Sequence, residues 1–320
     1  MGCGEQLREI LARLPEDKQT AMFSATLPKL LVDFTKAGLS DPVLIRLDAE
    51  TKIPDTLKMA FLYCRDEGKS SLLLYLLREI IPQNQQTVVF CATRHHVEYV
   101  HMILDLAGVS NTYLHSHLDP TARKINTAKF QAKKNSVLVV TDIAARGIDI
   151  PLLDNVINYN FPSRSKLFVH RVGRVARAGR TGVAYSLVSG EEMAYYIDLA
   201  LFLGAEIAFS PLKSNAADEW HNKMGSVPQR IYDDHADQLQ EWHSLHSELT
   251  DTKKVAQNGY KQYLKSRPAA SSESIRRAKT LKTQNMGPHP LLLKEVIDVD
   301  DAKRSDFLEE MKKFRPQNVS

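Results

Sequence analysis

The feature that most constrains the fold is a pair of short apolar runs, each followed by polar and basic residues. The first run covers residues 136–140, and a polar loop begins at Thr141. The second covers residues 155–159 and leads to a basic segment at 170–180. Short, mainly apolar runs are typical of strands buried on both faces of a parallel sheet. We therefore expect functional groups on the loops at the carboxyl ends of these strands.

Positive charge is concentrated around these two runs. Residues 155–190 contain no Asp or Glu but carry Arg164, Lys166, Arg171, Arg174, Arg177 and Arg180. A second window without acid, 120–141, carries Arg123, Lys124, Lys129, Lys133 and Lys134. The net charge of the chain is only +4, so the basic character is local. Guanidinium groups suit phosphate oxygens, and such windows favour a polyanion over a membrane or an acidic small molecule.

Strand-like and helix-like segments alternate through most of the first 200 or so residues. We expect strands at residues 57–64, 87–92, 111–114, 137–142, 156–160 and 183–188. Helices are expected at residues 71–81, 94–106, 121–131, 166–174 and 191–203. This alternation predicts an α/β fold with a parallel, doubly wound sheet.

After about residue 205 the alternation is lost. Two amphipathic stretches remain, at residues 237–249 and 303–314, and the composition of residues 265–272 is typical of a linker. In the first stretch, Trp242, Leu245 and Leu249 are spaced to cover one face of a helix. Such a helix would dock on the preceding domain or lie free; alternatively it would bind a partner.

Three segments in order carry a resemblance to a known family. Residues 141–149 (TDIAARGID) resemble motif V of the DEAD-box RNA helicases, and residues 170–177 (HRVGRVAR) resemble their motif VI. A Ser-Ala-Thr sequence resembles motif III; its residues are Ser24, Ala25 and Thr26. The end of the motif VI segment, together with residues 152–159, is similar to a subfamily of nucleolar helicases that act in large-ribosomal-subunit assembly.

The resemblance implies a RecA-like fold and three parts in the chain. Residues 1–50 would be the end of a first RecA-like lobe, and residues 51–204 the second, C-terminal lobe. Residues 205–320 would be a largely helical or disordered tail. The family's phosphate loop and Asp-Glu-Ala-Asp motif are not among the 320 residues. We therefore expect a fragment that lacks most of the first lobe and is inactive by itself.

A segment resembling a phosphate loop does occur in the second part. Gly68-Lys69-Ser70 lies between an expected strand and an expected helix, which is the context of such a loop. Tyr63 stands where the first glycine of the loop belongs, and without it the backbone amides cannot curl around a phosphate. We expect a degenerate counterpart of the loop rather than a working nucleotide site.

The resemblance also implies catalytic roles. Arg174 and Arg177 would be arginine fingers that reach the γ-phosphate of ATP, which the first lobe would hold together with Mg²⁺. His170 and Arg171 would couple this contact to motif III at the interface between the lobes. The alternative role for the arginines is binding of the RNA backbone.

Further contacts with nucleotide and RNA follow from the same resemblance. Gly147 would leave room for the nucleotide, and Asp149 would accept a hydrogen bond from the ribose. RNA-backbone contacts are expected at Thr93, Arg123, Thr141 and Asp142. Thr93 has an alternative role as a helix cap. The family's Gln-x-x-Arg motif is altered here, because Pro120 replaces the Gln, with Asp119 before it.

The histidines and cysteines indicate no metal site and no disulfide framework. His95, His96, His115 and His117 lack the spacing that would converge on one ion. The three cysteines are Cys3, Cys64 and Cys91, without a pairing pattern, which is typical of a reducing compartment. No apolar run approaches 18 residues and no signal peptide is evident, so we expect an intracellular protein that does not enter a membrane.

Two functions remain open at this point. In the first, the chain is the second lobe of an ATP-dependent RNA helicase that remodels RNA during ribosome biogenesis in the nucleolus. Its partners would be pre-ribosomal RNA and possible pre-ribosomal proteins. In the second, the chain is an inactive module that binds RNA or protein, because the phosphate loop and the Asp-Glu-Ala-Asp motif are absent.

Overall fold

The computed structural model describes residues 9–10, 12–15, 19, 53–146, 153–176, 179–214, 216–281 and 286–293. The chain divides into two compact units, Met1–Lys52 and Ile53–Ser320. Every strand of the described residues belongs to the second unit. The motif III residues of the first unit lie outside the described residues: Ser24, Ala25 and Thr26.

The second unit is built on an eight-stranded sheet with the order β3-β4-β2-β5-β6-β1-β8-β7. All neighbouring strands are parallel, which confirms the predicted doubly wound α/β fold. The strands are β1 (Leu57–Tyr63), β2 (Thr87–Cys91), β3 (Asn111–Leu114), β4 (Val137–Thr141), β5 (Asn155–Asn158), β6 (Gly182–Val188), β7 (Ala208–Phe209) and β8 (Lys223–Ser226). The first six were predicted. The last two were not, because β7 is very short and β8 has only one large apolar side chain.

Alternation along the central strands explains how the sheet separates two apolar cores. Val89 of β2 and Val139 of β4 enter one core, and their neighbours Val88 and Leu138 enter the other. All four side chains are almost completely buried, as expected for strands covered on both faces. The apolar runs noted in the sequence are therefore the centre of the sheet.

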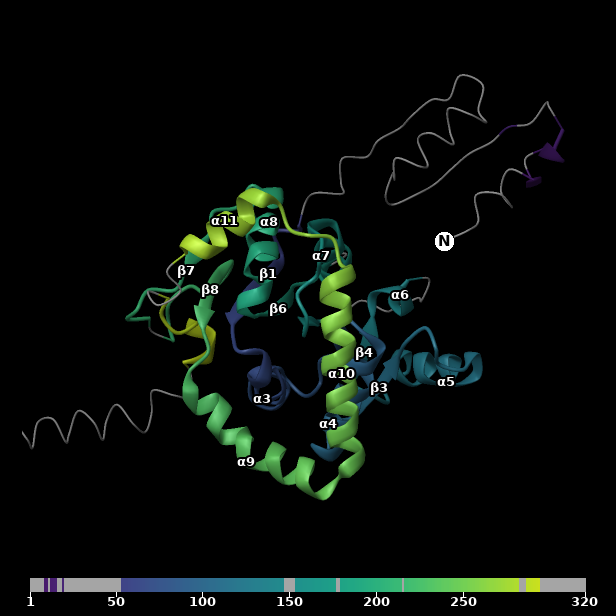
Figure 1. Cartoon of the computed structure of the whole chain (residues 1–320), viewed down its shortest axis with the longest axis horizontal. Helices are drawn as coiled ribbons and strands as arrows, with labels where there is room; N and C mark the ends of the chain where they lie inside the picture. Colours follow the sequence, from purple (N-terminus) through teal and green to yellow (C-terminus); the bar gives the residue numbers. More distant parts are fainter. Residues whose placement is uncertain are drawn as a thin grey trace, which may run out of the picture. The chain divides into compact units, whose positions relative to one another are not determined.

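Helices cover both faces and give three layers (Figure 1). One face is covered by α3 (Lys69–Tyr75), the π-helical turn η3 (Leu76–Ile80), α4 (Arg94–Leu106), α9 (Gln229–Leu245) and α10 (Ser247–Ser266). The other face is covered by α5 (Pro120–Gln131), α6 (Asp142–Ala145), α7 (Ser165–Val172), α8 (Met193–Leu203) and α11 (Ser272–Thr280). Within the described residues, no helix is both long and apolar enough to cross a membrane.

The region after residue 205 contains more helix than the sequence pattern suggested. The prediction of a single helix at residues 237–249 is wrong, because α9 ends at Leu245 and α10 begins at Ser247. Between them His246 has extended backbone angles, so the two leucines no longer share a helix face. Leu245 is 68% exposed, whereas Leu249 is fully buried. The stretch 303–314 lies outside the described residues.

These late helices pack on the sheet layers. Helix α9 packs against α3, α10 against α4, and α11 against α8. The predicted linker at 265–272 corresponds to the break between α10 and α11, where Ser271 caps α11 by accepting a hydrogen bond from the backbone N–H of Ser274. The three helices are therefore part of the second unit.

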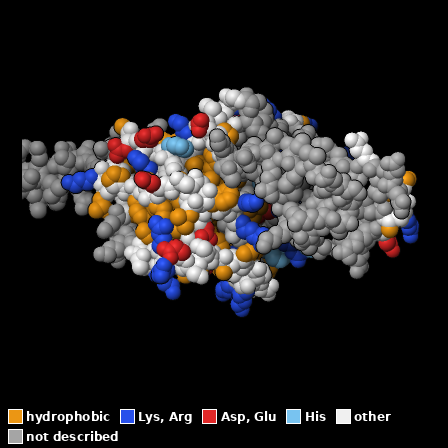
Figure 2. Space-filling view, turned by 90° about the horizontal axis from the view of Figure 1, so that it is seen from above, with side chains coloured by type: hydrophobic (Ala, Val, Ile, Leu, Met, Phe, Trp, Pro, Cys, Tyr) orange, Lys and Arg blue, Asp and Glu red, His pale blue; other side chains and the backbone are white. Residues whose placement is uncertain are grey.

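The outer face near α8 and α11 is mixed in character. Figure 2 shows apolar side chains gathered in the middle of the described surface, with Lys, Arg, Asp and Glu around them. Leu201 of α8 and Ile275 of α11 are among the exposed apolar side chains. Charges of both signs around an apolar centre do not suit a polyanion, which needs concentrated positive charge. This face is therefore not a candidate surface for binding a polyanion.

Leu249→Ala should lower the free energy of unfolding by about 2–5 kcal/mol, because it removes a fully buried side chain from the core under α10. The matched control is Leu245→Ala, just before the break between α9 and α10, which should change it by less than about 0.5 kcal/mol. Urea unfolding followed by circular dichroism measures both. Equal effects of the two substitutions would contradict the packing of α10 on the sheet layer.

Candidate nucleotide and nucleic-acid site

The residues singled out in the sequence lie mainly at one edge of the sheet. Because every strand is parallel, the carboxyl ends of β1, β2, β4, β5 and β6 meet there. Thr93 follows β2, Thr141 ends β4, and Asn160 follows β5. This is the edge at which ligands bind in open parallel sheets.

A short ion pair at this edge joins the motif V and motif VI segments. Arg171 on α7 donates from Nε to Asp142 Oδ1 at 2.7 Å and from Nη2 to Asp142 Oδ2 at 2.8 Å. The side chain of Arg171 is only 1% exposed. A bidentate guanidinium–carboxylate pair fixes both distance and orientation. The two motif segments are therefore locked together within the lobe.

Arg171 makes further contacts that use the rest of its guanidinium. Nη1 donates to Asn158 Oδ1 at 3.0 Å and to the carbonyl of Asn160 at 2.8 Å. The guanidinium also lies over the Phe90 ring, 5.0 Å from its centroid. Burial acts to lower the pKa of Arg171, but the Asp142 carboxylate more than reverses this and raises it. Arg171 is therefore a charged group enclosed in the lobe, which was not evident from its motif position.

The other predicted catalytic residues lie on and after α7. His170 is exposed on α7, and Arg174 is half-buried in the turn that follows. The carbonyl of Arg174 accepts a hydrogen bond from the backbone N–H of Leu153. Ala176 has a φ of 57°, a left-handed conformation that is strained for a residue with a Cβ. The predicted residues Arg177, Gly147 and Asp149 lie outside the described residues.

The two predicted RNA-contacting threonines are both helix caps. The Thr93 hydroxyl accepts from the backbone N–H of His96 at 3.2 Å and caps α4. The Thr141 hydroxyl accepts from the backbone N–H of Ala144 at 3.4 Å and caps α6. Thr93 is half-buried and Thr141 is buried. Each hydroxyl therefore has a local structural role beside any contact with RNA.

Arg123 connects α5 to the motif V segment. Its Nη2 donates to the carbonyl of Ala144 at 2.9 Å. Asp119 caps α5, accepting from the backbone N–H of Thr121 at 2.8 Å, and Pro120 occupies the first turn of the helix. The departure from the family's Gln-x-x-Arg pattern is therefore a helix start, in which the carboxylate is engaged by backbone amides.

The segment resembling a phosphate loop is filled by the protein's own side chains. Lys69 is 2% exposed, and its Nζ lies 2.7 Å from Glu192 Oε2 and 3.1 Å from Asp66 Oδ1. At Gly68 a Cβ atom would lie 2.2 Å from Cε1 of the Tyr232 ring, so this space is occupied. Lys69 has no room to meet a phosphate, as expected for a degenerate loop.

Sequence reasoning missed four residues that organise this edge: Lys69 in its buried role, Asn160, Glu192 and Tyr260. These residues stand in no strong sequence motif, and Glu192 and Tyr260 lie outside the segments that carry the family resemblance most strongly. The available signal was an acidic residue in the short turn between the β6 run and the next helix, where a buried carboxylate needs partners. No group of three His, Cys, Asp or Glu within the described ranges could hold a metal ion.

Comparisons with known proteins agree with this geometry. Residues 68–179 match the model of the helicase conserved C-terminal domain. The chain is 49% identical over 324 residues to the ATP-dependent RNA helicase DDX54 of Mus musculus, covering 100% of this chain and 37% of that protein. It is 40% identical over 365 residues to the ATP-dependent RNA helicase dbp10 of Emericella nidulans, covering 100% and 38%. The chain thus spans less than two fifths of the length of these relatives.

A solved structure shows the same fold. Dbp5 L327V of S. cerevisiae, bound to RNA and ADP BeF3, matches with a TM-score of 0.58 and 24% sequence identity, over 75% of this chain and 59% of that chain. This likeness concerns the RecA-like architecture of the lobe. The likeness of the chain to RNA helicases rests on the family model and on the relatives, which match along the whole chain. Along its whole length the chain is similar to DEAD-box RNA helicases, and residues 68–179 match the helicase conserved C-terminal domain.

Proposed function

We propose that the chain acts as the second lobe of an ATP-dependent RNA helicase and supplies cations and RNA contacts for ATP-driven remodelling of RNA. The observation that carries the proposal is the bidentate Arg171–Asp142 pair, which holds the motif VI segment against the motif V segment at the carboxyl edge. The relatives that match the whole chain bear the name ATP-dependent RNA helicase, which supports this activity for the full-length protein.

In this proposal Arg174 and Arg177 are the arginine fingers. Phosphoryl transfer places negative charge on the equatorial oxygens of the transferred group, and a cation held there lowers the barrier. Arg171 is enclosed and cannot reach a ligand, so its role is to fix α7 and hence the turn that carries Arg174. The strained backbone at Ala176 suits a segment whose geometry serves function.

The first lobe would hold ATP and Mg²⁺ in the full-length protein. Mg²⁺ bound to the phosphates neutralises charge during transfer. Within this chain, Gly147 and Asp149 are proposed to lie beside the nucleotide, and His170 to couple the fingers to Ser24, Ala25 and Thr26. Lys69 is bound by Glu192, so this lobe has no open phosphate loop. Its proposed contribution to the nucleotide site is the cations Arg174 and Arg177.

RNA would be held through its backbone by the loops that leave β2 and β4. Thr93 and Thr141 stand at helix amino termini, where backbone amides attract anions. Arg123 lies beside the motif V helix, and Asp142 positions Arg171 rather than meeting RNA with its carboxylate. Contacts with sugar and phosphate bind RNA without reading its sequence.

The biological setting is proposed from the subfamily resemblance of residues 152–159 and 170–180. It points to ribosome assembly in the nucleolus of the nucleus, with pre-ribosomal RNA as substrate and pre-ribosomal proteins as possible partners. The chain by itself is proposed to bind RNA without hydrolysing ATP. The Glu192 carboxylate that binds Lys69 favours this second role for the isolated chain, because it closes the loop at residues 68–70 that resembles a phosphate loop.

Replacing Arg174 or Arg177 by Ala in the full-length protein should reduce RNA-stimulated ATP hydrolysis by about 10³-fold or more, as for other arginine fingers. ATP binding should change far less, since a finger acts mainly on the transition state. The control is Arg180→Ala, which removes an exposed ion pair with Asp154 and should leave turnover within a few-fold. If both finger variants keep near-normal turnover while RNA affinity falls, this basic segment is an RNA clamp instead.

Arg123→Ala should weaken binding of single-stranded RNA by this chain about threefold to tenfold, equally for unrelated sequences. The slope of log Kd against log salt should fall by about 0.7, the value for one lost phosphate contact. Lys134→Ala removes the same charge from an exposed turn before β4, at the opposite edge of the sheet, and should leave the slope unchanged. A strong preference for one RNA sequence would count against backbone recognition. Fluorescence anisotropy at several salt concentrations measures both quantities.

A further inference from the structure

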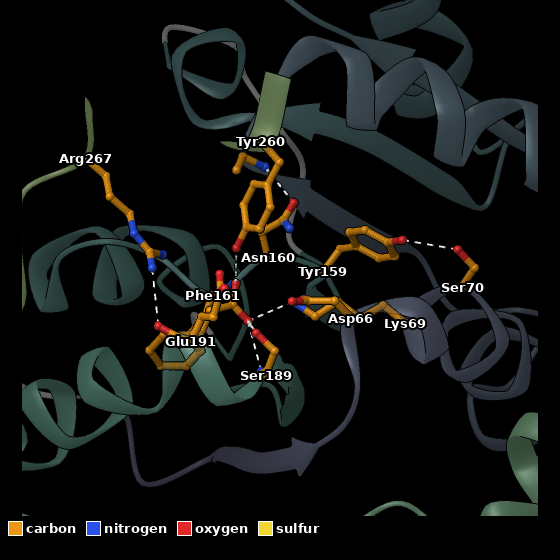
Figure 3. Close-up of polar contacts among 12 residues, drawn as sticks. Asp66, Lys69, Ser70, Tyr159, Asn160, Phe161, Ser189, Glu191, Tyr260 and Arg267 are labelled. Carbon is orange, nitrogen blue, oxygen red and sulfur yellow. Dashed lines mark hydrogen bonds and ion pairs between the residues drawn. The ribbon is translucent and has the colours of Figure 1, made fainter. Parts of the chain in front are cut away.

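A carboxylate with no exposed surface lies beside α10. Glu192, in the turn η4 (Gly190–Glu192), is 0% exposed. Its Oε2 accepts from Lys69 Nζ at 2.7 Å and from the backbone N–H of Ser189 at 3.1 Å. Its Oε1 accepts from the backbone N–H of Phe161 at 2.8 Å and from the Tyr260 hydroxyl at 2.9 Å. Figure 3 shows Lys69, Phe161, Ser189 and Tyr260, which come from separate segments of the chain, lying close to one another.

The buried Lys69–Glu192 pair needs hydrogen-bond partners for both of its groups, because water cannot reach them. Burial acts to lower the pKa of Lys69, but the Glu192 charge outweighs it and raises the pKa well above its usual value. Both groups are thus enclosed, and Lys69 is held as a cation. Removing a partner from a buried carboxylate leaves charge that water cannot reach, so each donor to Glu192 matters more than a surface hydrogen bond would.

A single peptide group connects Glu192 to Arg171. The N–H of Phe161 donates to Glu192, and the C=O of the same peptide, that of Asn160, accepts from Arg171 Nη1 at 2.8 Å. A peptide group is planar, so any rotation that weakens one of these bonds weakens the other. Asn160 Oδ1 also accepts from the backbone N–H of Ala92 at 2.9 Å, next to Thr93. The peptide is therefore held from both sides by charged groups.

Helix α10 is fastened over this edge at its carboxyl half. The Tyr260 ring meets the edge of the His96 ring, with centroids 5.1 Å apart. Farther along, the Arg267 guanidinium lies over the Tyr195 ring at 4.1 Å and donates to the carbonyl of Glu191 at 3.3 Å. The Tyr195 hydroxyl donates to the carbonyl of Pro268 at 3.0 Å. One tyrosine hydroxyl thus ties α10 to the lobe and another ties the segment just after α10, but only that of Tyr260 reaches Glu192.

We propose that Tyr260 is a positioning residue for the Arg171–Asp142 pair. It acts through Glu192 and the Asn160–Phe161 peptide, so that the C-terminal helix α10 sets the orientation of the motif VI segment. The order of contacts is Tyr260 Oη, Glu192 Oε1, the peptide, Arg171 Nη1, then Asp142. The structural linkage stands on these contacts, and its effect on turnover rests on the proposed helicase function.

The linkage itself is tested on the 320-residue chain with Tyr260→Phe, which removes the hydroxyl and keeps the ring. Proton NMR of the chain labelled with ¹⁵N and deuterium should show the Arg171 Nε–H signal shifted. Hydrogen exchange of the Phe161 amide should quicken about tenfold or more, because the Glu192 carboxylate that holds this amide loses its hydrogen bond from the Tyr260 hydroxyl. The matched variant Tyr195→Phe also removes a tyrosine hydroxyl, one that ties the segment just after α10 to the lobe, and should change neither signal.

The inference is overturned if Tyr260→Phe leaves both signals unchanged, or if Tyr195→Phe alters them equally, since α10 would then act only by general packing. In the full-length protein, Tyr260→Phe should lower kcat of RNA-stimulated ATP hydrolysis about fivefold to tenfold, with the Kd for RNA within about twofold. Tyr195→Phe should leave kcat within about twofold. A fall in RNA affinity with unchanged kcat contradicts positioning of Arg171.

The two proposals fail in different ways. If the unaltered full-length protein shows no RNA-stimulated hydrolysis, the proposed function is wrong, and the NMR comparison still decides the linkage. If hydrolysis is present and depends on Arg174 but not on Tyr260, the proposed function stands and the positioning role is rejected.

Discussion

The interaction on which the rest of the structure depends is the buried Arg171–Asp142 pair. It joins a helix after β5 to the residue that follows β4. It uses Nε and Nη2 of Arg171, and Nη1 donates to Asn158 and Asn160. A guanidinium out of contact with water requires full compensation, and the carboxyl edge is arranged to provide it. The buried Arg171 thus fixes the first part of the motif VI segment, and the exposed residues of the segment can change their contacts.

A second buried pair, Lys69–Glu192, has a comparable place on the same edge. In RecA-like folds a lysine after the first strand of a lobe is suited to phosphate, whereas here a carboxylate from the chain itself takes that position. The charge of Lys69 is used to hold an internal loop. One lobe of such a protein can thus keep the geometry of a nucleotide-binding fold while its lysine serves stability, leaving nucleotide binding to another lobe.

The sequence allowed the sheet and most of its helices to be predicted, because the apolar runs of β2 and β4 and the helical pattern of α4 are strong. It also placed Thr93, Arg123, Thr141 and Asp142 near one edge, where the structure has them. It could not reveal the partners of these groups, since the pair of Arg171 with Asp142 spans 29 residues and that of Lys69 with Glu192 spans 123. The break at His246 was missed because an amphipathic pattern continues across it.

The two ends of the sheet are both short. Strand β3 has four residues and β7 only two, although the strands between them are longer on average. A strand that approached either outer strand would meet few unpaired backbone groups, so edge-to-edge pairing of two such sheets is disfavoured. Short outer strands of this kind protect a sheet against edge-to-edge aggregation.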